Sequence, residues 1–287
     1  MYFSVVIPTY NRKQTLRQTL LALHRQDYSD FEIIVVDDGS TDDTREMVHQ
    51  EFPRVHLLCQ EQNRGPAAAR NLGIHTAKGE IIAFTDDDCL PPDDWLTRLA
   101  DGYARYPTAI GGGGSLIAPT ALLKTDLFAQ YEHYIGGQVY HADEREYFGS
   151  IECPGGGTAN TSYRRSVLLE IGGFDEEFPV AAGEDADLRS RICNRGYKLF
   201  YVPIWVIHLQ EYSWQRFRRQ CFVRGVGRNY FEERHGDGYP SRFKVVLRMV
   251  RRVSVLPLDL CRMPDKRLAF IKLADGIITC YGQWVGK

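Results

Sequence analysis

The sequence predicts an α/β protein in which a mostly parallel sheet is flanked by helices and followed by a helical C-terminal extension. Two observations predict it. Short aliphatic runs alternate with helical segments through the first ninety or so residues, a pattern typical of parallel sheets covered on both faces. From Trp214 onward the pattern becomes helical, basic and aromatic. The composition, with 44% hydrophobic and 25% charged residues in a chain of 287, excludes disorder, collagen and coiled coil as the main architecture.

Four apolar runs are expected to form the strands of this sheet. They are residues 4–7, which Pro8 should end, and residues 31–38, 55–60 and 80–88. Helices should lie between them. The first follows Asn11 with Leu16, Leu20 and Leu23 on one face, the second follows the turn DGSTDDT, and the third spans 67–77 after Gly65-Pro66.

Polar clusters stand where these strands end, at residues 8–11, 37–40, 63–64 and 86–88. The carboxyl ends of parallel strands share one edge of the sheet, and ligands bind outside that edge. Four coincidences of this kind favour a binding site over a purely structural protein.

The domain organisation is predicted from the change of pattern near residue 210. Residues 1–210 should form one domain. Residues 211–287 should form a basic, mainly helical extension.

The net charge of −2 conceals an asymmetry, because residues 205–287 hold 16 Lys+Arg and only 7 Asp+Glu. An acidic body with a basic tail suggests that the tail meets an anionic surface. Seven scattered cysteines without a CxxC pair favour a reducing compartment and argue against a zinc site or a disulfide framework. We expect a cytoplasmic protein, because the sequence shows neither a secretory leader nor an apolar run of about 18 residues.

The segment 242–252, RFKVVLRMVRR, carries five basic residues and no acid. A helical wheel divides it into an apolar and a basic side, with Val245 as a misfit. The apolar side holds Phe243, Val246, Leu247 and Val250, and the basic side holds Arg242, Lys244, Arg248, Arg251 and Arg252. Such a helix could lie peripherally on an anionic membrane. The alternative is a helix packed on the catalytic domain with its basic face in solvent.

The triplet Asp86-Asp87-Asp88 directly follows an expected buried strand. Carboxylates this close repel one another unless a cation lies among them, and hard divalent ions prefer oxygen ligands. The triplet is therefore suited to Mg²⁺ or Mn²⁺ bridging a diphosphate. The alternative is a solvated acidic turn that caps the helix after Pro91-Pro92.

A set of motifs in a fixed order surrounds these features: SVVIPTYNR, VVDDGSTDDT, NRGPAAARNLGI, GEIIAFTDDDCLPPDDWL, GGFDEEF and GEDADLRSR. Together, over residues 3–210, they resemble the family 2 inverting glycosyltransferases, which have a GT-A fold. The resemblance implies transfer of a sugar from a nucleotide-diphosphate donor, with UDP expected, to a hydroxyl of a saccharide or lipid-linked acceptor. It also implies a divalent metal cofactor, Mn²⁺ or Mg²⁺, and a role in polysaccharide biosynthesis. Residues 1–210 would then be the catalytic domain, with a nucleotide-binding half at 1–110 and an acceptor half at 111–210.

The resemblance also implies roles for single residues in donor binding. Asp38 would accept a hydrogen bond from the base, Arg70 would approach the nucleotide or diphosphate, and Asp88 would ligate the metal. The alternative for Arg70 is an ion pair with a surface acid. The other donor-site residues implied are Pro8, Thr9, Tyr10 and Asn11 around the nucleotide, Asp86 at the ribose, and Asp87.

The pair Glu184-Asp185 begins an expected helix over residues 183–195 and resembles the family's catalytic acids. An inverting transfer needs one base to deprotonate the acceptor hydroxyl, while the metal assists the diphosphate leaving group. Asp185 is expected to be that base and Glu184 an acceptor contact. The alternative is that both acids only favour the helix dipole.

His208 follows the expected strand 205–207 and would complete the metal shell, or would be a hydrogen-bonded histidine of the core or rim. The glycines at 155–157, before residues 158–160, resemble an acceptor-side strand. They could let the backbone approach a sugar, or could form a bend.

Other classes of protein fit less well. A dinucleotide oxidoreductase needs G-x-G-x-x-G where this chain has PTYNRK, and the P-loop motif is absent. A glycosidase could use two carboxylates but needs no nucleotide pocket. A nucleotidyltransferase and a catalytically degenerate nucleotide-sugar-binding homologue stay as alternatives. Nucleic acid is not an expected partner, since no recognition motif accompanies the basic tail.

Overall fold

The apolar runs of the first half form buried strands, because their aliphatic side chains fill both faces of a sheet. The computed structural model describes residues 1–139, 145–155, 157–236, 242–263 and 265–286. The chain divides into two units. The sheet unit comprises Met1–Ile117, Gly136–Glu176 and Asp185–Leu209, and the helical unit comprises Ala118–Ile135, Glu177–Glu184 and Gln210–Lys287.

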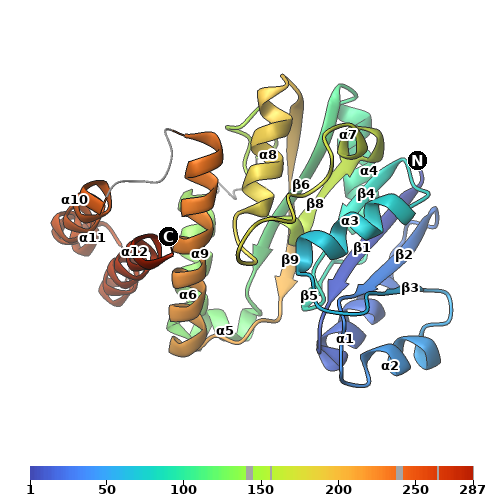
Figure 1. Cartoon of the computed structure of the whole chain (residues 1–287), viewed down its shortest axis with the longest axis horizontal. Helices are drawn as coiled ribbons and strands as arrows, with labels where there is room; N and C mark the ends of the chain where they lie inside the picture. The colour runs from blue at the N-terminus through green and yellow to red at the C-terminus, as the bar shows by residue number, and fades with distance from the viewer. Residues whose placement is uncertain (140–144, 156, 237–241, 264, 287) are drawn as a thin grey trace. The chain divides into compact units, whose positions relative to one another are not determined.

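Among the described residues, nine strands form one sheet in the order β3-β2-β1-β4-β8-β6-β9-β5, with β7 also paired to β9 (Figure 1). Their bounds are β1 Phe3–Thr9, β2 Phe31–Asp37, β3 His56–Cys59, β4 Ile81–Phe84, β5 Cys89–Leu90, β6 Ala109–Ile117, β7 Tyr147–Gly149, β8 Thr161–Arg164 and β9 Lys198–His208.

The predicted parallel sheet is confirmed for β3-β2-β1-β4 and for the long β6–β9 pair. Antiparallel pairing enters where β8 lies between β4 and β6, and where β5 and β7 pair with β9. After the glycine run 155–157, Thr158–Asn160 forms a 3₁₀ turn and the next strand, β8, begins at Thr161.

Contrary to the prediction, Pro8 does not end the first strand. β1 continues to Thr9, with Pro8 opposite Val36. The reason is the direction of the hydrogen bonds. Val6 faces β4, as the bond from the Thr85 amide to its carbonyl shows, and Pro8, two residues on, faces the same side. The pairing with β4 has already ended at Val6. Pro8 therefore has no strand beside it on that side, and its missing N–H costs no hydrogen bond of the sheet.

Helices cover both faces of the sheet, as predicted. Alternate residues of β1 enter opposite cores, with Val5 and Ile7 in one and Val6 in the other. The first core receives α1 Lys13–Leu23, α2 Thr44–Glu51 and α4 Trp95–Arg105. The second receives α3 Pro66–Thr76, α7 Arg165–Glu170 and α8 Glu184–Asn194.

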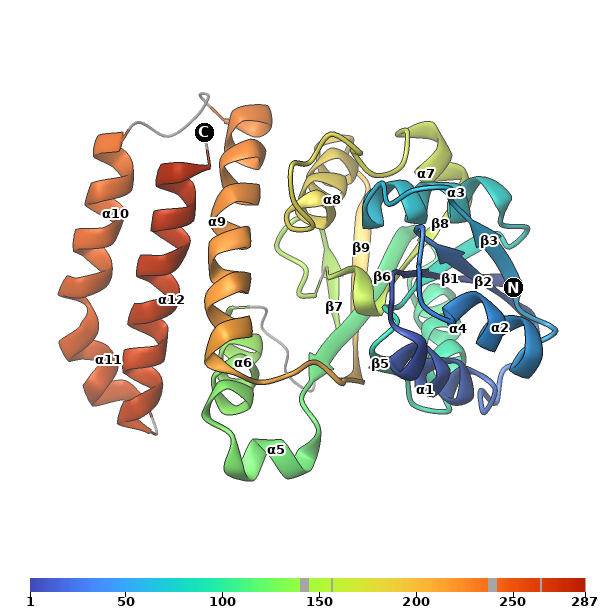
Figure 2. The same ribbon diagram turned by 60° about the horizontal axis from the view of Figure 1, so that its bottom comes forward.

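The predicted helical C-terminal region is confirmed in the helical unit. Its helices are α5 Thr120–Thr125, the first part of α6 Leu127–Val139, α9 Trp214–His235, α10 Arg242–Ser254, α11 Leu256–Arg262 and α12 Lys266–Val285. Tyr131, Phe217, Cys221 and Leu268 form a core of their own between α6, α9 and α12. Figure 2 shows α12 lying between α9 and α10.

Asn160 connects three parts of the sheet unit from a fully buried position. Its Oδ1 accepts a hydrogen bond of 2.9 Å from the Trp95 indole N–H, and its Nδ2 donates to the carbonyls of Ser115 at 2.9 Å and Ile204 at 3.0 Å. Asn160→Ala would leave these partners buried without hydrogen bonds. We expect a loss of about 3 kcal/mol in the free energy of unfolding, measured by urea denaturation.

The matched control is Asn194→Ala on an exposed position of α8, which should change the free energy of unfolding by less than about 0.5 kcal/mol. Equal unfolding midpoints for the two variants would contradict the structural role of Asn160.

Candidate functional site

The carboxyl ends of β2, β1 and β4 lie side by side, because these strands are parallel neighbours. Side chains that follow different strands contact one another there. Thr9 Oγ1 donates to Asp87 Oδ2 at 2.8 Å, and the backbone N–H of Asn11 donates to Ser40 Oγ at 2.8 Å. The predicted gathering of polar clusters at one sheet edge is confirmed.

Asn11 shapes the turn after β1. Its φ of 53° is in the left-handed region, which asparagine tolerates better than most side chains. Its Oδ1 accepts hydrogen bonds from the Thr41 amide at 2.7 Å and the Asp42 amide at 3.3 Å, which ties this turn to the loop after β2. Pro8 is buried beneath the turn, whereas the neighbouring Tyr10 ring is exposed. An exposed ring on a fixed turn can stack on a nucleobase.

Asp38 orders the loop that leads into α3. Its carboxylate is buried and accepts hydrogen bonds from Gln60 Nε2 at 3.0 Å and from the Arg64 and Gly65 amides at 2.8 Å each. Burial raises the pKa of Asp38, although the two amides oppose the shift. A nucleobase would have to share this carboxylate with the loop, so its contact with the base stays a prediction.

Arg70 and Asp86, expected at different parts of the donor, form an ion pair with each other. Arg70 Nη2 lies 2.9 Å from Asp86 Oδ1, and the guanidinium lies over the Phe174 ring, 5.6 Å from its centroid. Arg70 is buried while Asp86 is partly exposed. The ion-pair alternative for Arg70 is therefore realised, and a contact of either residue with the donor stays a prediction.

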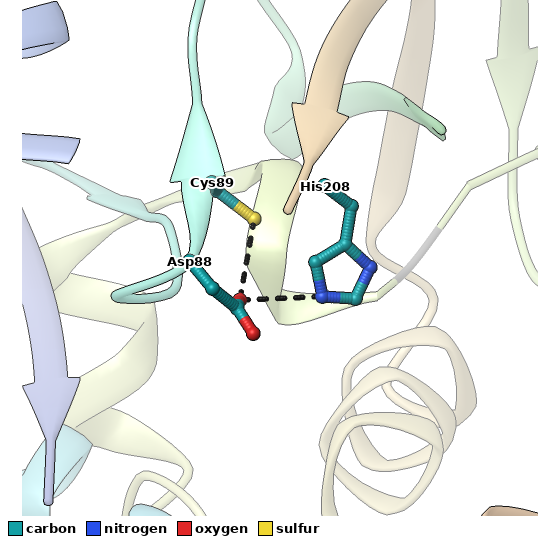
Figure 3. A group of neighbouring side chains, drawn as sticks. All are labelled: Asp88, Cys89 and His208. Atoms are coloured by element: carbon teal, nitrogen blue, oxygen red, sulfur yellow. Dashed lines mark hydrogen bonds and ion pairs between the residues drawn. The ribbon is translucent and has the colours of Figure 1, made fainter. Parts of the chain in front are cut away.

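Asp88 and His208, the two predicted metal ligands, lie together although they are far apart in the sequence. Antiparallel pairing of β5 with β9 sets Cys89 opposite His208, and the Leu209 amide donates to the Asp88 carbonyl at 2.7 Å. As a result His208 Nε2 lies 3.2 Å from Asp88 Oδ1 (Figure 3).

Cys89, which sequence reasoning missed, is the third member of this group, and one ligand atom from each residue lies within 4.8 Å of the others. Burial raises the pKa of its thiol well above the ordinary value. Cys89 therefore contributes an uncharged thiol beside Asp88 and His208, and it is a poor ligand for a hard cation.

Arg12 was also missed by sequence reasoning, and its guanidinium contacts two acids of the triplet. Its Nη1 is 2.5 Å from Asp88 Oδ2 and 3.5 Å from Asp87 Oδ1. The signal was its place directly after the TYN turn, at the same sheet edge as the three acids.

The pKa values of the two buried carboxyls, Asp87 and Asp88, are shifted in opposite directions. Burial alone would raise the pKa of Asp88, but the hydrogen bond and charge of His208, with the charge of Arg12, outweigh burial and hold that pKa well below its ordinary value. Burial raises the pKa of Asp87 to about 7, against the attraction of Arg12 and the hydrogen bond from Thr9. Asp88 is thus an anion across the physiological pH range.

The residues present fit a divalent cation. The Asp88 carboxylate, whose pKa is held low, and the His208 imidazole nitrogen lie 3.2 Å apart, and Arg12 connects the Asp87 carboxyl to the same group. Mixed oxygen and nitrogen donors suit Mn²⁺, and the carboxylates also suit Mg²⁺.

The predicted helix over 183–195 is confirmed as α8, which begins at Glu184. Glu184 is buried, whereas Asp185 is half-buried and accepts a hydrogen bond of 2.8 Å from the Ala186 amide. Burial raises the pKa of Tyr163 on β8 to about 12, and the negative charge of Asp185 adds to that shift. The Asp185 carboxylate thus contributes to the electrostatic environment of Tyr163. Its place in the first turn is compatible with catalysis and with the helix-dipole alternative.

Arg189, one turn after Asp185, is a further residue that the sequence did not single out. Its buried guanidinium donates to the Gly155 carbonyl at 3.0 Å and the Ile151 carbonyl at 3.2 Å. Gly155 has a φ of 78°, so its backbone is in the left-handed region, and the Arg189 bond connects it to α8. Gly156 lies outside the described residues.

A family model and several known proteins are similar to this chain. The family model described as Glycosyl transferase family 2 matches residues 4–172. A relative from Haloferax volcanii, glucosyl-dolichyl phosphate glucuronosyltransferase, is 30% identical over 183 residues, which are 61% of this chain and 56% of the relative. The chain therefore spans little more than half the length of that curated relative.

Two solved structures share the fold at low sequence identity. A mannosyltransferase from Pyrobaculum calidifontis, in complex with GDP-Man and Mn²⁺, has a TM-score of 0.66 at 19% identity, covering 97% of this chain and 85% of its own. TarS of S. aureus (residues 1–349), in complex with UDP-GlcNAc, has a TM-score of 0.55 at 18% identity, covering 99% and 91%. The predicted GT-A fold is confirmed by these likenesses.

Proposed function

The chain belongs to glycosyl transferase family 2. We propose that it is a glycosyltransferase that transfers the sugar of a UDP-sugar to an acceptor hydroxyl with inversion. The observation that carries the proposal is the Asp88–His208 pair, beside the β1 and β2 turns at the carboxyl edge of the sheet. Residues 1–110 would bind the donor and residues 111–210 the acceptor.

In the proposed reaction Asp185 takes the proton of the acceptor hydroxyl as its oxygen attacks the anomeric carbon. The new glycosidic C–O bond forms while the C–O bond to the diphosphate breaks, so one displacement inverts the anomeric centre. Glu184 would contact the acceptor. A positioned base of this kind contributes about 10²–10⁴-fold to rate.

Asp88 and His208 would hold a divalent ion, Mn²⁺ or Mg²⁺, which neutralises developing charge on the leaving diphosphate. Arg12, anchored on Asp87 and Asp88, adds a fixed positive charge at the same edge. Tyr10 would stack on the base, Asp38 would accept its N–H, and Asp86 with Arg70 would contact the ribose and diphosphate.

The donor and acceptor classes draw support from the relatives. The fold neighbours were solved with GDP-Man and with UDP-GlcNAc, so both are nucleotide-sugar binders. The Haloferax volcanii relative is named for glucosyl-dolichyl phosphate, which supports a lipid-linked saccharide as acceptor in polysaccharide assembly. The seven free cysteines suit a reducing compartment, so we place the reaction on the cytoplasmic side of a membrane.

The first test is a thermal-shift panel of UDP, GDP and TDP with Mn²⁺. A ligand at a hundred times its dissociation constant stabilises the folded state by about 2.7 kcal/mol, which raises the melting temperature by about 5 °C for a domain of this size. We expect the largest shift with UDP and its loss when EDTA replaces Mn²⁺.

ADP with Mn²⁺ is the control nucleotide and should give a smaller shift. Equal shifts for all four diphosphates would contradict base recognition, and a UDP shift that survives EDTA would contradict the metal site. Hydrolysis of UDP-sugar in the presence of Mn²⁺ then distinguishes an active enzyme from a homologue that only binds.

A further inference from the structure

The apolar side of α10 is exposed within the helical unit. Phe243 is 71% exposed, Val250 is 59% exposed and Leu247 is 50% exposed. Val246 and Val253 continue the same side, and the 100° step between successive helix residues places all five within less than half of the helix circumference. We call these five residues the apolar face of α10.

The opposite side of α10 is the side that packs. Val245, the misfit of the helical wheel, is fully buried. Arg248 extends in the same direction, donating to Gln283 Oε1 of α12 at 3.1 Å and to Glu232 Oε2 of α9 at 3.0 Å. Within the helical unit, therefore, the apolar side of α10 does not pack inward, and the Arg248 guanidinium forms contacts inside the unit.

An amphipathic helix in a monomeric soluble protein normally buries its apolar stripe, and a contiguous exposed patch marks an interaction surface. The charges beside the face indicate what it meets. Lys244 and Arg251 flank it on one side of the wheel, Arg252 is exposed as well, and no acid lies between residues 242 and 254.

We propose that the apolar face of α10 and its flanking cations dock the protein on an anionic lipid bilayer, with the helix in the plane of the interface. Cations beside an apolar face are typical of interfacial helices, and each basic residue near an anionic surface strengthens partitioning by about fivefold. A second copy of the same face would set cations against cations, which disfavours self-association. The convex face of one helix is also unlike a groove built for a peptide.

This inference deepens the proposed function, because docking would hold the enzyme where a lipid-linked acceptor resides. Among the helices of the described residues, none combines the length and apolar character needed to cross a membrane. The surface on α10 supplies a peripheral attachment that needs no spanning helix.

The test is flotation of the full chain with vesicles of phosphatidylcholine alone and of phosphatidylcholine with phosphatidylglycerol at three to one. We expect recovery with the anionic vesicles, weakening as salt is raised. Leu247→Ser/Val250→Ser should lower partitioning by about tenfold or more because it removes inserted apolar surface, and Arg251→Gln should lower it by about fivefold on anionic vesicles only.

Leu21→Ser/Leu169→Ser, at two exposed leucines of the sheet unit, is the matched control and should float like the wild type. UDP and Mn²⁺ binding by each variant reports folding and the donor site separately from lipid binding. Absence of the wild type from both floating fractions, or equal flotation of all variants, would overturn the docking surface whatever the donor site does. A dimer in solution that Leu247→Ser/Val250→Ser dissociates would instead assign the face to a second copy, and would equally overturn the proposal.

Discussion

Replacing Asp185 with asparagine is expected to lower transfer by about 10²–10⁴-fold, because the amide keeps the shape of the side chain but cannot take a proton. Donor binding should survive, since the proposed role of Asp185 concerns the acceptor. Transfer is measured as release of UDP in the presence of acceptor, and donor affinity by calorimetry. The position is compatible with this role, because Asp185 is half-buried in the first turn of α8.

Asp187→Asn is the matched control on the same helix. Asp187 is buried and pairs with Arg191 at 2.8 Å, so its loss should lower the melting temperature without a comparable loss of transfer per folded molecule. Near-normal transfer by Asp185→Asn would refute the assignment of the base, and Glu184→Gln would then be the variant to examine.

Replacing Asp88 with alanine should weaken binding of the UDP-sugar by about 10²–10³-fold, because the metal contributes several kcal/mol through the diphosphate. The dependence of binding on Mn²⁺ should disappear together with the affinity. Calorimetric titration of UDP with and without Mn²⁺ measures both. The same change also removes the partner of Arg12 and His208, so the melting temperature of the metal-free variant is recorded alongside.

Asp86→Asn separates metal binding from nucleotide binding. Asp86 pairs with Arg70 rather than with His208, so this variant should bind the donor less tightly but keep its dependence on Mn²⁺. If Asp88→Ala retained the Mn²⁺ dependence while Asp86→Asn lost it, the metal would be held by the first acid of the triplet and not by the Asp88–His208 pair.

Much of the fold could be predicted because its cause is local. The run of residues 31–38 has the β-branched composition of a buried strand, and Gly65-Pro66 has the chemistry of a helix start. Both elements lie where they were expected, at β2 and α3. The predicted edge of polar clusters followed from the parallel order of three such strands, because that order forces their carboxyl ends together.

The site residues that belong to a recognisable motif were predicted, whereas those that only tertiary packing brings to the site were missed. Asp88 and His208 were both predicted as ligands on the family resemblance, yet their contact depends on β5 pairing with β9. Arg12, Cys89 and Arg189 were missed, since an arginine or cysteine in sequence does not show which carboxylate or carbonyl it will meet after folding.

The sequence by itself determined the order of strands and helices in the first ninety residues, the family, and the amphipathic division of the segment 242–252. These depend on hydrogen-bonding periodicity and side-chain chemistry within a few residues. Only the tertiary structure decided that β8 runs antiparallel between β4 and β6, that His208 reaches Asp88, and that α10 turns Val245 inward and Phe243 outward. Each of these is a choice between long-range pairings or between faces of one helix, and it depends on the sum of many weak packing contacts across the fold.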